Sequence, residues 1–148
     1  MKNFTKMKRS DFEKKLFERF DPMYGNHKLP MTQTCMCWGL DHGQGWYNLI
    51  WELSEKIEKE IKKNKDLEIF RVSQVKEKFG TLRFYYDGNW DDDIESLIDT
   101  AERKSEQICE VCGKDTGKSN LRGAGWIYNR CDECYEKLRR KKERKNEN

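Results

Sequence analysis

Apolar residues recur at helical spacing in three stretches of the chain. In residues 46–64 they follow steps of three, four and seven, the spacing of one buried helix face. Residues 91–108 repeat this pattern after three successive aspartates, whose negative charges favour a helix N-terminus. Residues 11–20 form a shorter stretch with phenylalanine and leucine four positions apart. The pattern therefore predicts three helices.

The residues around the first helix predict its boundaries. Ser10 can cap the N-terminus, and Glu13, three positions later, completes a capping box. Pro22 ends the helix, and residues 21–45 then indicate an ordered loop with one short strand around Cys35–Trp38.

Residues 68–87 alternate apolar and polar positions around a glycine turn, which predicts a β-hairpin. On its second arm Leu82, Phe84 and Tyr86 share one face. Together these elements predict an α+β domain over residues 1–108, with three helices and a small antiparallel β-sheet.

The composition agrees with a small core and suggests a compartment. Of the 148 residues, 35% are hydrophobic and 39% charged, while a 12% aromatic share supplies much burial per residue. No apolar stretch is long enough to cross a bilayer and no signal-peptide pattern is present, so we expect a cytoplasmic protein with no membrane partner. In that compartment six cysteines favour metal ligation or free thiols over disulfides.

The net charge of +3 is unevenly distributed along the chain. Residues 1–20 and 135–148 each hold seven basic and three acidic residues, a net +4 at either end. Because only the ends are basic, the indication of nucleic-acid binding is weaker than for a uniformly basic domain. The last segment, residues 141–148, is expected to be a disordered basic tail.

From residue 109 the composition changes to a module rich in cysteine and glycine, which we expect over residues 109–140. Two C-x2-C pairs supply the candidate metal ligands Cys109, Cys112, Cys131 and Cys134. Eighteen residues separate the pairs, a spacing typical of one structural zinc ion. Gly113 can adopt the positive φ of a tight knuckle. A knuckle, a hairpin and a helix begun by the second pair are typical of a treble-clef-like zinc module.

Other roles for the cysteines are less favoured. Four thiolates fill a tetrahedral zinc and leave no position for a catalytic water. A redox pair lacks a βαβ context, and four free cysteines are the remaining alternative. Cys35 and Cys37 are separated by one residue, so they either lie on a strand or need His27 and His42 to complete a second metal site.

A glycine-rich loop from Gly39 to Gly45 runs directly into the longest predicted helix. Glycines before a helix N-terminus can cradle a phosphate with backbone N–H groups, but they can also simply permit a turn. The P-loop and Rossmann signatures are absent. Asp41 and Trp46 are the candidate binding residues of this segment.

The hairpin mixes cationic and aromatic side chains. Its candidate binding residues are Lys76, Lys78, Arg83 and Tyr85. Such a mixture can stack bases and grip phosphates, can form a protein interface, or can be a solvated sheet face. Motifs of serine hydrolases, zinc proteases and deaminases are absent, so an enzyme is less favoured than a binding protein.

Three motifs occur in a fixed order: GQGWYNLIWELSEKIEK, then VKEKFGTLRFYYDG, then CEVCG with GWIYNRCDEC. In this order they resemble a family of small bacteriophage and prophage proteins of unassigned function. The chain departs from the family pattern at Gln44, where an acidic residue is usual. The resemblance implies a phage origin and a bacterial host cytoplasm, and it supplies no mechanism.

We therefore expect a non-enzymatic phage accessory protein that binds a host or phage macromolecule, with a protein as the favoured partner. Such binding would inhibit a host defence system or redirect a host machine. The first alternative is a zinc-finger protein that binds nucleic acid through the basic tail. The second is a protein that sequesters a nucleotide at the glycine loop.

Overall fold

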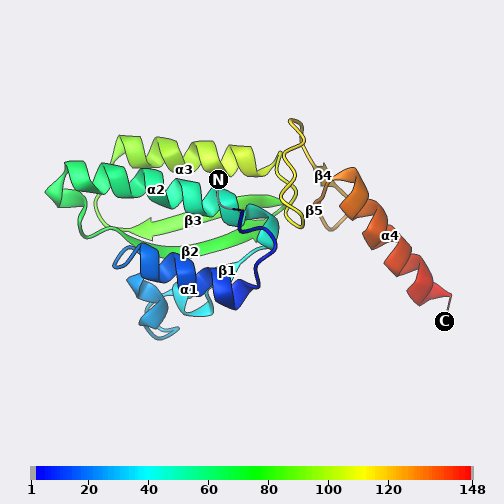
Figure 1. The fold of residues 1–148 in the computed structure, drawn as a ribbon, viewed down its shortest axis with the longest axis horizontal. Coiled ribbons are helices and arrows are strands. Elements are labelled where there is room, and N and C mark those ends of the chain that lie inside the picture. Colours follow the sequence, from blue (N-terminus) through cyan, green and yellow to red (C-terminus); the bar gives the residue numbers. More distant parts are fainter. Residues whose placement is uncertain (1–2, 148) are drawn as a thin grey trace.

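The longest amphipathic stretch forms a helix, as its pattern predicts. The computed structural model describes residues 3–147 (Figure 1). That range contains four α-helices: α1 (Arg9–Arg19), α2 (Tyr47–Lys63), α3 (Asp92–Ser105) and α4 (Asp132–Asn146). None of the helices in this range is both long and apolar enough to cross a membrane.

Helix α4 is the helix expected at the second cysteine pair; it raises the count from the three helices of the predicted α+β domain to four, and it corrects the expected disordered tail. The helix continues through residues 141–146, and Asn148 lies outside the described residues. Lysine, arginine and glutamate have high helix propensity, and glutamates pair with arginines four positions away on this helix. The composition that suggested disorder is therefore compatible with a solvated helix.

A three-stranded sheet has the order β1–β2–β3. Its strands are β1 (Leu40–Asp41), β2 (Arg71–Lys78) and β3 (Thr81–Asp87). The predicted hairpin is confirmed as the antiparallel pair β2–β3. Strand β1 runs parallel to β2, so the sheet is mixed rather than antiparallel. A two-residue strand has no periodicity of its own, and only its long-range pairing defines it.

The predicted strand around Cys35–Trp38 is wrong. These residues form a short 3-10 helix, η2, and Thr34 caps it by accepting a hydrogen bond from the Met36 N–H. The hydrogen bond from the Met36 N–H to the Thr34 hydroxyl stabilises this helical turn in place of an extended strand.

The predicted capping box at Ser10 is also absent. Helix α1 begins at Arg9, and Lys8 at the N-cap makes no side-chain cap. The Glu13 carboxylate accepts hydrogen bonds from Arg9 Nε at 2.6 Å and from the Leu40 N–H at 3.0 Å. A long-range contact has thus replaced the local cap.

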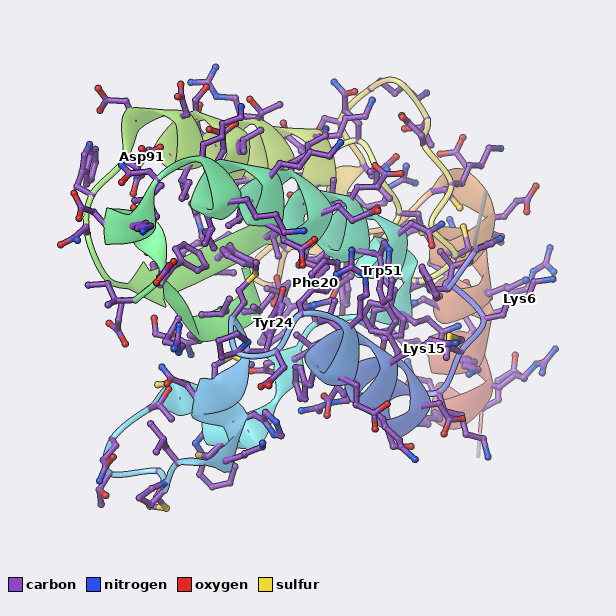
Figure 2. The ribbon with its side chains drawn as sticks, turned by 60° about the vertical axis from the view of Figure 1, so that its left-hand side comes forward. Lys6, Lys15, Phe20, Tyr24, Trp51 and Asp91 are labelled. Carbon is purple, nitrogen blue, oxygen red and sulfur yellow. The ribbon has the colours of Figure 1, made fainter. Side chains whose placement is uncertain are left out.

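Helices α2 and α3 lie side by side over the hairpin in Figure 1. The sheet residues buried in the core are Leu40, Val72, Val75, Leu82 and Phe84. Helix α1 packs along α2 through aromatic rings, with Phe12 stacked on Tyr47 at a centroid distance of 4.1 Å. Figure 2 shows Phe20 and Trp51 in the same contact, where their ring centroids lie 5.1 Å apart.

Helix α3 also covers the outer edge of β3. The Leu82 N–H donates to Ser105 Oγ at 2.9 Å, and the Phe84 N–H donates to Glu102 Oε2 at 3.0 Å. These backbone groups would otherwise be available to pair with another strand. Side chains of α3 therefore take the place of a fourth strand along this part of the edge.

Removing the Ser105 hydroxyl should destabilise the fold. Ser105→Ala leaves the buried Leu82 N–H without an acceptor, so we expect a loss of about 1–3 kcal/mol in the free energy of unfolding. Ser96→Ala, on an exposed position of the same helix, should change stability by less than about 0.5 kcal/mol. Urea denaturation of both variants measures the difference, and equal stabilities would contradict the edge-capping role.

Candidate metal centre and basic groove

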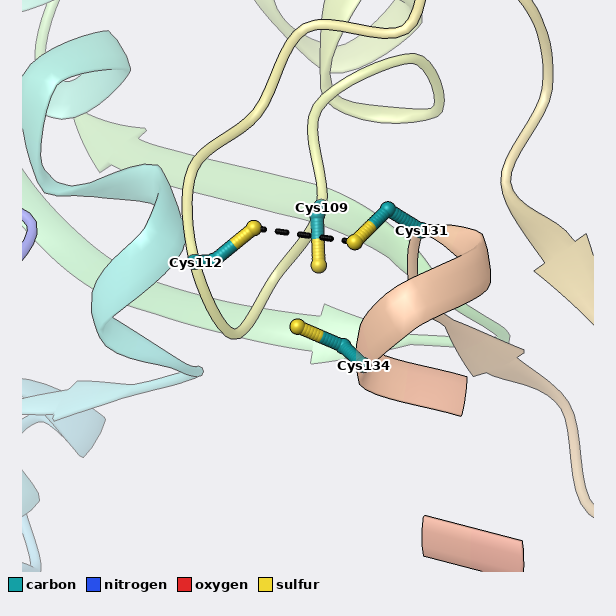
Figure 3. Close-up of side chains that lie close together, drawn as sticks. All are labelled: Cys109, Cys112, Cys131 and Cys134. Carbon is teal, nitrogen blue, oxygen red and sulfur yellow. Dashed lines mark hydrogen bonds between the residues drawn. The ribbon is translucent and has the colours of Figure 1, made fainter. Parts of the chain in front are cut away.

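The four predicted cysteine ligands meet at one point (Figure 3). Their sulfur atoms all lie within 4.8 Å of one another, and Cys112 Sγ lies 3.7 Å from Cys131 Sγ. A tetrahedral ion with metal–sulfur bonds of about 2.3 Å requires sulfur–sulfur distances of about 3.8 Å. The cluster therefore has the dimensions of a metal site.

Local backbone conformation explains how the cysteines are positioned. Gly113 has a φ of +82°, as predicted, and its N–H donates to the Cys109 carbonyl at 2.9 Å, closing the first knuckle. A hairpin follows, formed by β4 (Leu121–Arg122) and β5 (Tyr128–Asn129). Cys131 is the N-cap of α4, so the second pair opens that helix. The predicted order of knuckle, hairpin and helix is present.

The thiols differ in acidity. Burial raises the pKa of Cys109, but backbone N–H groups of Cys112, Cys131 and Val111 outweigh it and lower the pKa to about 7. The pKa of Cys134 is raised by burial and by the neighbouring sulfurs. Four thiolates this close repel one another, so complete ionisation needs a cation among them.

The glycine loop lies against the first knuckle. The Gly45 N–H donates to the Glu110 carbonyl at 2.7 Å, and the Gly43 N–H donates to Glu110 Oε2 at 2.8 Å. A Cβ atom on Gly45 would lie 2.0 Å from the Cys109 carbonyl oxygen. The glycines thus permit a close backbone approach. Because Glu110 already occupies both N–H groups, the phosphate cradle considered for this loop is not supported, and the alternative that the glycines permit a turn agrees with the contacts.

Trp46 is a core residue and not a surface binding residue. Its side chain is fully buried, and its Nε1–H donates to the Ile108 carbonyl at 2.9 Å. Asp41, the other candidate from this segment, is exposed at the end of β1. Trp46 belongs both to the apolar helical pattern of residues 46–64 and to the candidate binding residues. Its burial agrees with the apolar pattern.

The candidate residues of the hairpin share one face. Lys76, Lys78 and Tyr85 line a shallow pocket of about 390 Å³, and Arg83 is paired with Lys76 across the strands. Arg83 Nε is buried and has no hydrogen-bond partner among the described residues. That these side chains bind a partner stays a prediction.

The second metal site is not supported among residues 3–147. Only the four cysteines of the module form a group able to hold a metal there. His27 stacks on Phe17, and His42 makes a hydrogen bond from its Nδ1 position to the Gly43 carbonyl. Cys35 and Cys37 remain free thiols on η2.

A basic groove of about 630 Å³, which the sequence did not reveal, adjoins the cysteines. Its cationic side chains are Lys6, Arg130, Lys137, Arg140, Lys141 and Arg144. No aspartate or glutamate is among the described residues that line it. The spacing of lysines and arginines along α4 could have indicated one basic face, but the contribution of distant residues could not be predicted. Figure 2 shows Lys6 beside α4.

Comparison of the chain with protein-family models, with curated proteins and with solved structures finds no match. The resemblance to phage proteins therefore stays a prediction.

Adding a methyl group at Gly45 should separate the loop from the knuckle. We expect Gly45→Ala to lower the free energy of unfolding by at least about 2 kcal/mol, because backbone atoms of Cys109 and Glu110 occupy the space. Gly25→Ala is the matched control, since nothing lies within 4 Å of its added Cβ. Chemical denaturation of both variants checks the prediction, and it fails if Gly45→Ala is as stable as the control.

Proposed function

We propose that the ion of the cysteine cluster is zinc and that its role is structural. Four thiolates are soft ligands that favour Zn²⁺, and they leave no open coordination position for catalysis. The order of knuckle, hairpin and helix supports a treble-clef-like module. In this arrangement the ion would join the start of α4 to the knuckle that the glycine loop contacts.

We further propose that the protein binds nucleic acid in the basic groove. The supporting observation is that three segments of the chain bring six cations around one groove without an acidic neighbour among the lining residues. Phosphate contacts of this kind supply most of the affinity of nucleic-acid-binding proteins. One of these cations, Arg140, lies within 4 Å of Glu136, a residue of α4 that is not among the lining residues.

The shape of α4 suits this partner. With 15 residues the helix is about 22 Å long, and a helix of this width enters the major groove of a duplex. Trp126 is 68% exposed and lines a neighbouring pocket with Val111 and Arg130, which also line the basic groove. An exposed ring beside phosphate-binding cations can stack on an unpaired base. Single-stranded and double-stranded ligands should therefore both be tested.

A protein partner, such as a host or phage protein, is the second candidate. Phe79, at the tip of the hairpin, is 66% exposed beside Lys78, and Tyr85 is 45% exposed. Exposed aromatic and cationic side chains of this kind concentrate binding energy at protein interfaces. This candidate becomes the leading one if the groove fails to bind nucleic acid.

Loss of one ligand should remove zinc and destabilise the protein. We expect one zinc per chain in the purified protein and none in Cys112→Ser, with a melting temperature lower by at least about 10 °C. Cys35→Ser, which changes a thiol outside the cluster, should retain the zinc and the melting temperature. Elemental analysis with calorimetry measures both. A zinc-free wild-type protein whose stability is insensitive to a chelator would contradict the proposal.

Reversing two charges in the groove should weaken nucleic-acid binding. For Lys137→Glu with Lys141→Glu we expect at least about tenfold weaker affinity and a log–log salt slope smaller by about 2. Lys56→Glu with Lys59→Glu makes the same charge change on exposed positions of α2 and should leave the slope unchanged. Fluorescence anisotropy with mixed-sequence RNA and DNA across salt concentrations gives both quantities. Equal losses for the two variants, or negligible binding at low salt, would overturn the proposal.

A further inference from the structure

A further cavity, of about 400 Å³, lies between β3 and α3. Its lining begins at Phe84 and Glu102, past the Leu82 position that Ser105 caps, and continues along β3 to Tyr86 and Gly88. Backbone N–H groups point alternately to the two edges of a strand, so the Tyr86 N–H points to the same edge of β3 as the N–H groups of Leu82 and Phe84. The cavity is therefore an opening in an otherwise covered edge.

Aromatic side chains form part of its wall. Tyr86 stacks on Phe70 with ring centroids 4.6 Å apart, and its hydroxyl donates to Glu95 Oε1 at 2.6 Å. Trp90 follows a turn at Gly88, and its Nε1–H donates to Asp92 Oδ1 at 2.8 Å. This bond holds a ring that is nevertheless 72% exposed. A core tryptophan would not be left in water, so the ring is available to a ligand.

Carboxylates complete the cavity. Glu95 and Glu102 line it, and neither makes an ion pair with a lysine or arginine among the described residues. No basic side chain of the described chain lines the cavity. Burial raises the pKa of Glu102, although the Phe84 N–H and the Arg83 charge partly oppose this effect. A cation placed in the cavity would offset that desolvation cost.

We propose that this cavity binds an organic cation, namely an alkylammonium or guanidinium group. An aromatic face attracts such groups through its quadrupole, and a carboxylate at the same place adds charge-assisted hydrogen bonding. Trp90 and Tyr86 supply the rings, and Glu95 and Glu102 supply the charge. The group can belong to a free small molecule or to a lysine or arginine side chain of a peptide. This site is separate from the basic groove and does not depend on nucleic-acid binding.

Fluorine NMR of the full-length protein labelled with 5-fluorotryptophan tests the proposal, with the Trp90 resonance assigned from Trp90→Phe. Choline and Nα-acetylarginine amide are the cationic probes. Their neutral counterparts of nearly the same shape are 3,3-dimethylbutanol and Nα-acetylcitrulline amide. We expect the Trp90 resonance to shift with millimolar affinity for at least one cation and not for its neutral counterpart. A response to choline alone indicates a free quaternary cation, whereas a response to Nα-acetylarginine amide indicates a guanidinium side chain.

Variants separate a binding role from a structural one. Glu95→Gln retains an acceptor for the Tyr86 hydroxyl but removes the charge, so the affinity for the cation should fall at least about threefold without a change in melting temperature. Trp38→Phe is the control, because it changes an exposed tryptophan that does not line this cavity. Trp38 is 63% exposed, and the variant should bind the cation as the wild type does. The proposal is overturned if neither cation shifts Trp90, if the neutral counterparts bind equally, or if Glu95→Gln binds as the wild type does.

Discussion

The contact between the glycine loop and the first cysteine knuckle determines how the two ends of the chain are arranged. Gly45 and Glu110 are joined backbone to backbone, and the absent side chain of Gly45 lets the Cys109 carbonyl approach. On one side of this contact α2 begins, and on the other the four clustered cysteines begin. Gln44, in the same loop, also donates to the Thr5 carbonyl and so fixes the segment that places Lys6 in the groove. Both the core helix and the basic groove therefore depend on one close approach of main chains.

Charge is separated along the molecule. The basic groove lies along α4, and the cavity with Glu95 and Glu102 lies along α3 and β3, which are away from α4 in Figure 1. Like charges gathered in one groove repel one another and cost stability unless a rigid framework or a ligand compensates. The proposed zinc would provide the framework, and a polyanion would relieve the repulsion. The net charge of +3 conceals this division.

Periodicity and spacing were sufficient for the parts of the fold that are defined locally. The α2 stripe, the β2–β3 hairpin and the cysteine pairs each have a pattern within a few residues of sequence. Features defined by distant contacts were not predictable. Glu13 accepts a hydrogen bond from the distant Leu40 N–H instead of completing a capping box, and β1 is defined only by its pairing with β2. The groove combines Lys6 and Arg130 with α4, residues that no local pattern connects.

The burial of Trp46 has a consequence for synthesis on the ribosome. Its indole N–H is satisfied by the carbonyl of Ile108, 62 positions later in the chain. At a synthesis rate of about 5–20 residues per second, the start of α2 waits roughly 3–12 s for that acceptor to be made. Until then the indole N–H of Trp46 and the N–H groups of Gly43 and Gly45 have no native acceptor. The hydrogen bonds at the start of α2 are therefore completed only after Ile108 and Glu110, in the last third of the chain, have been synthesised.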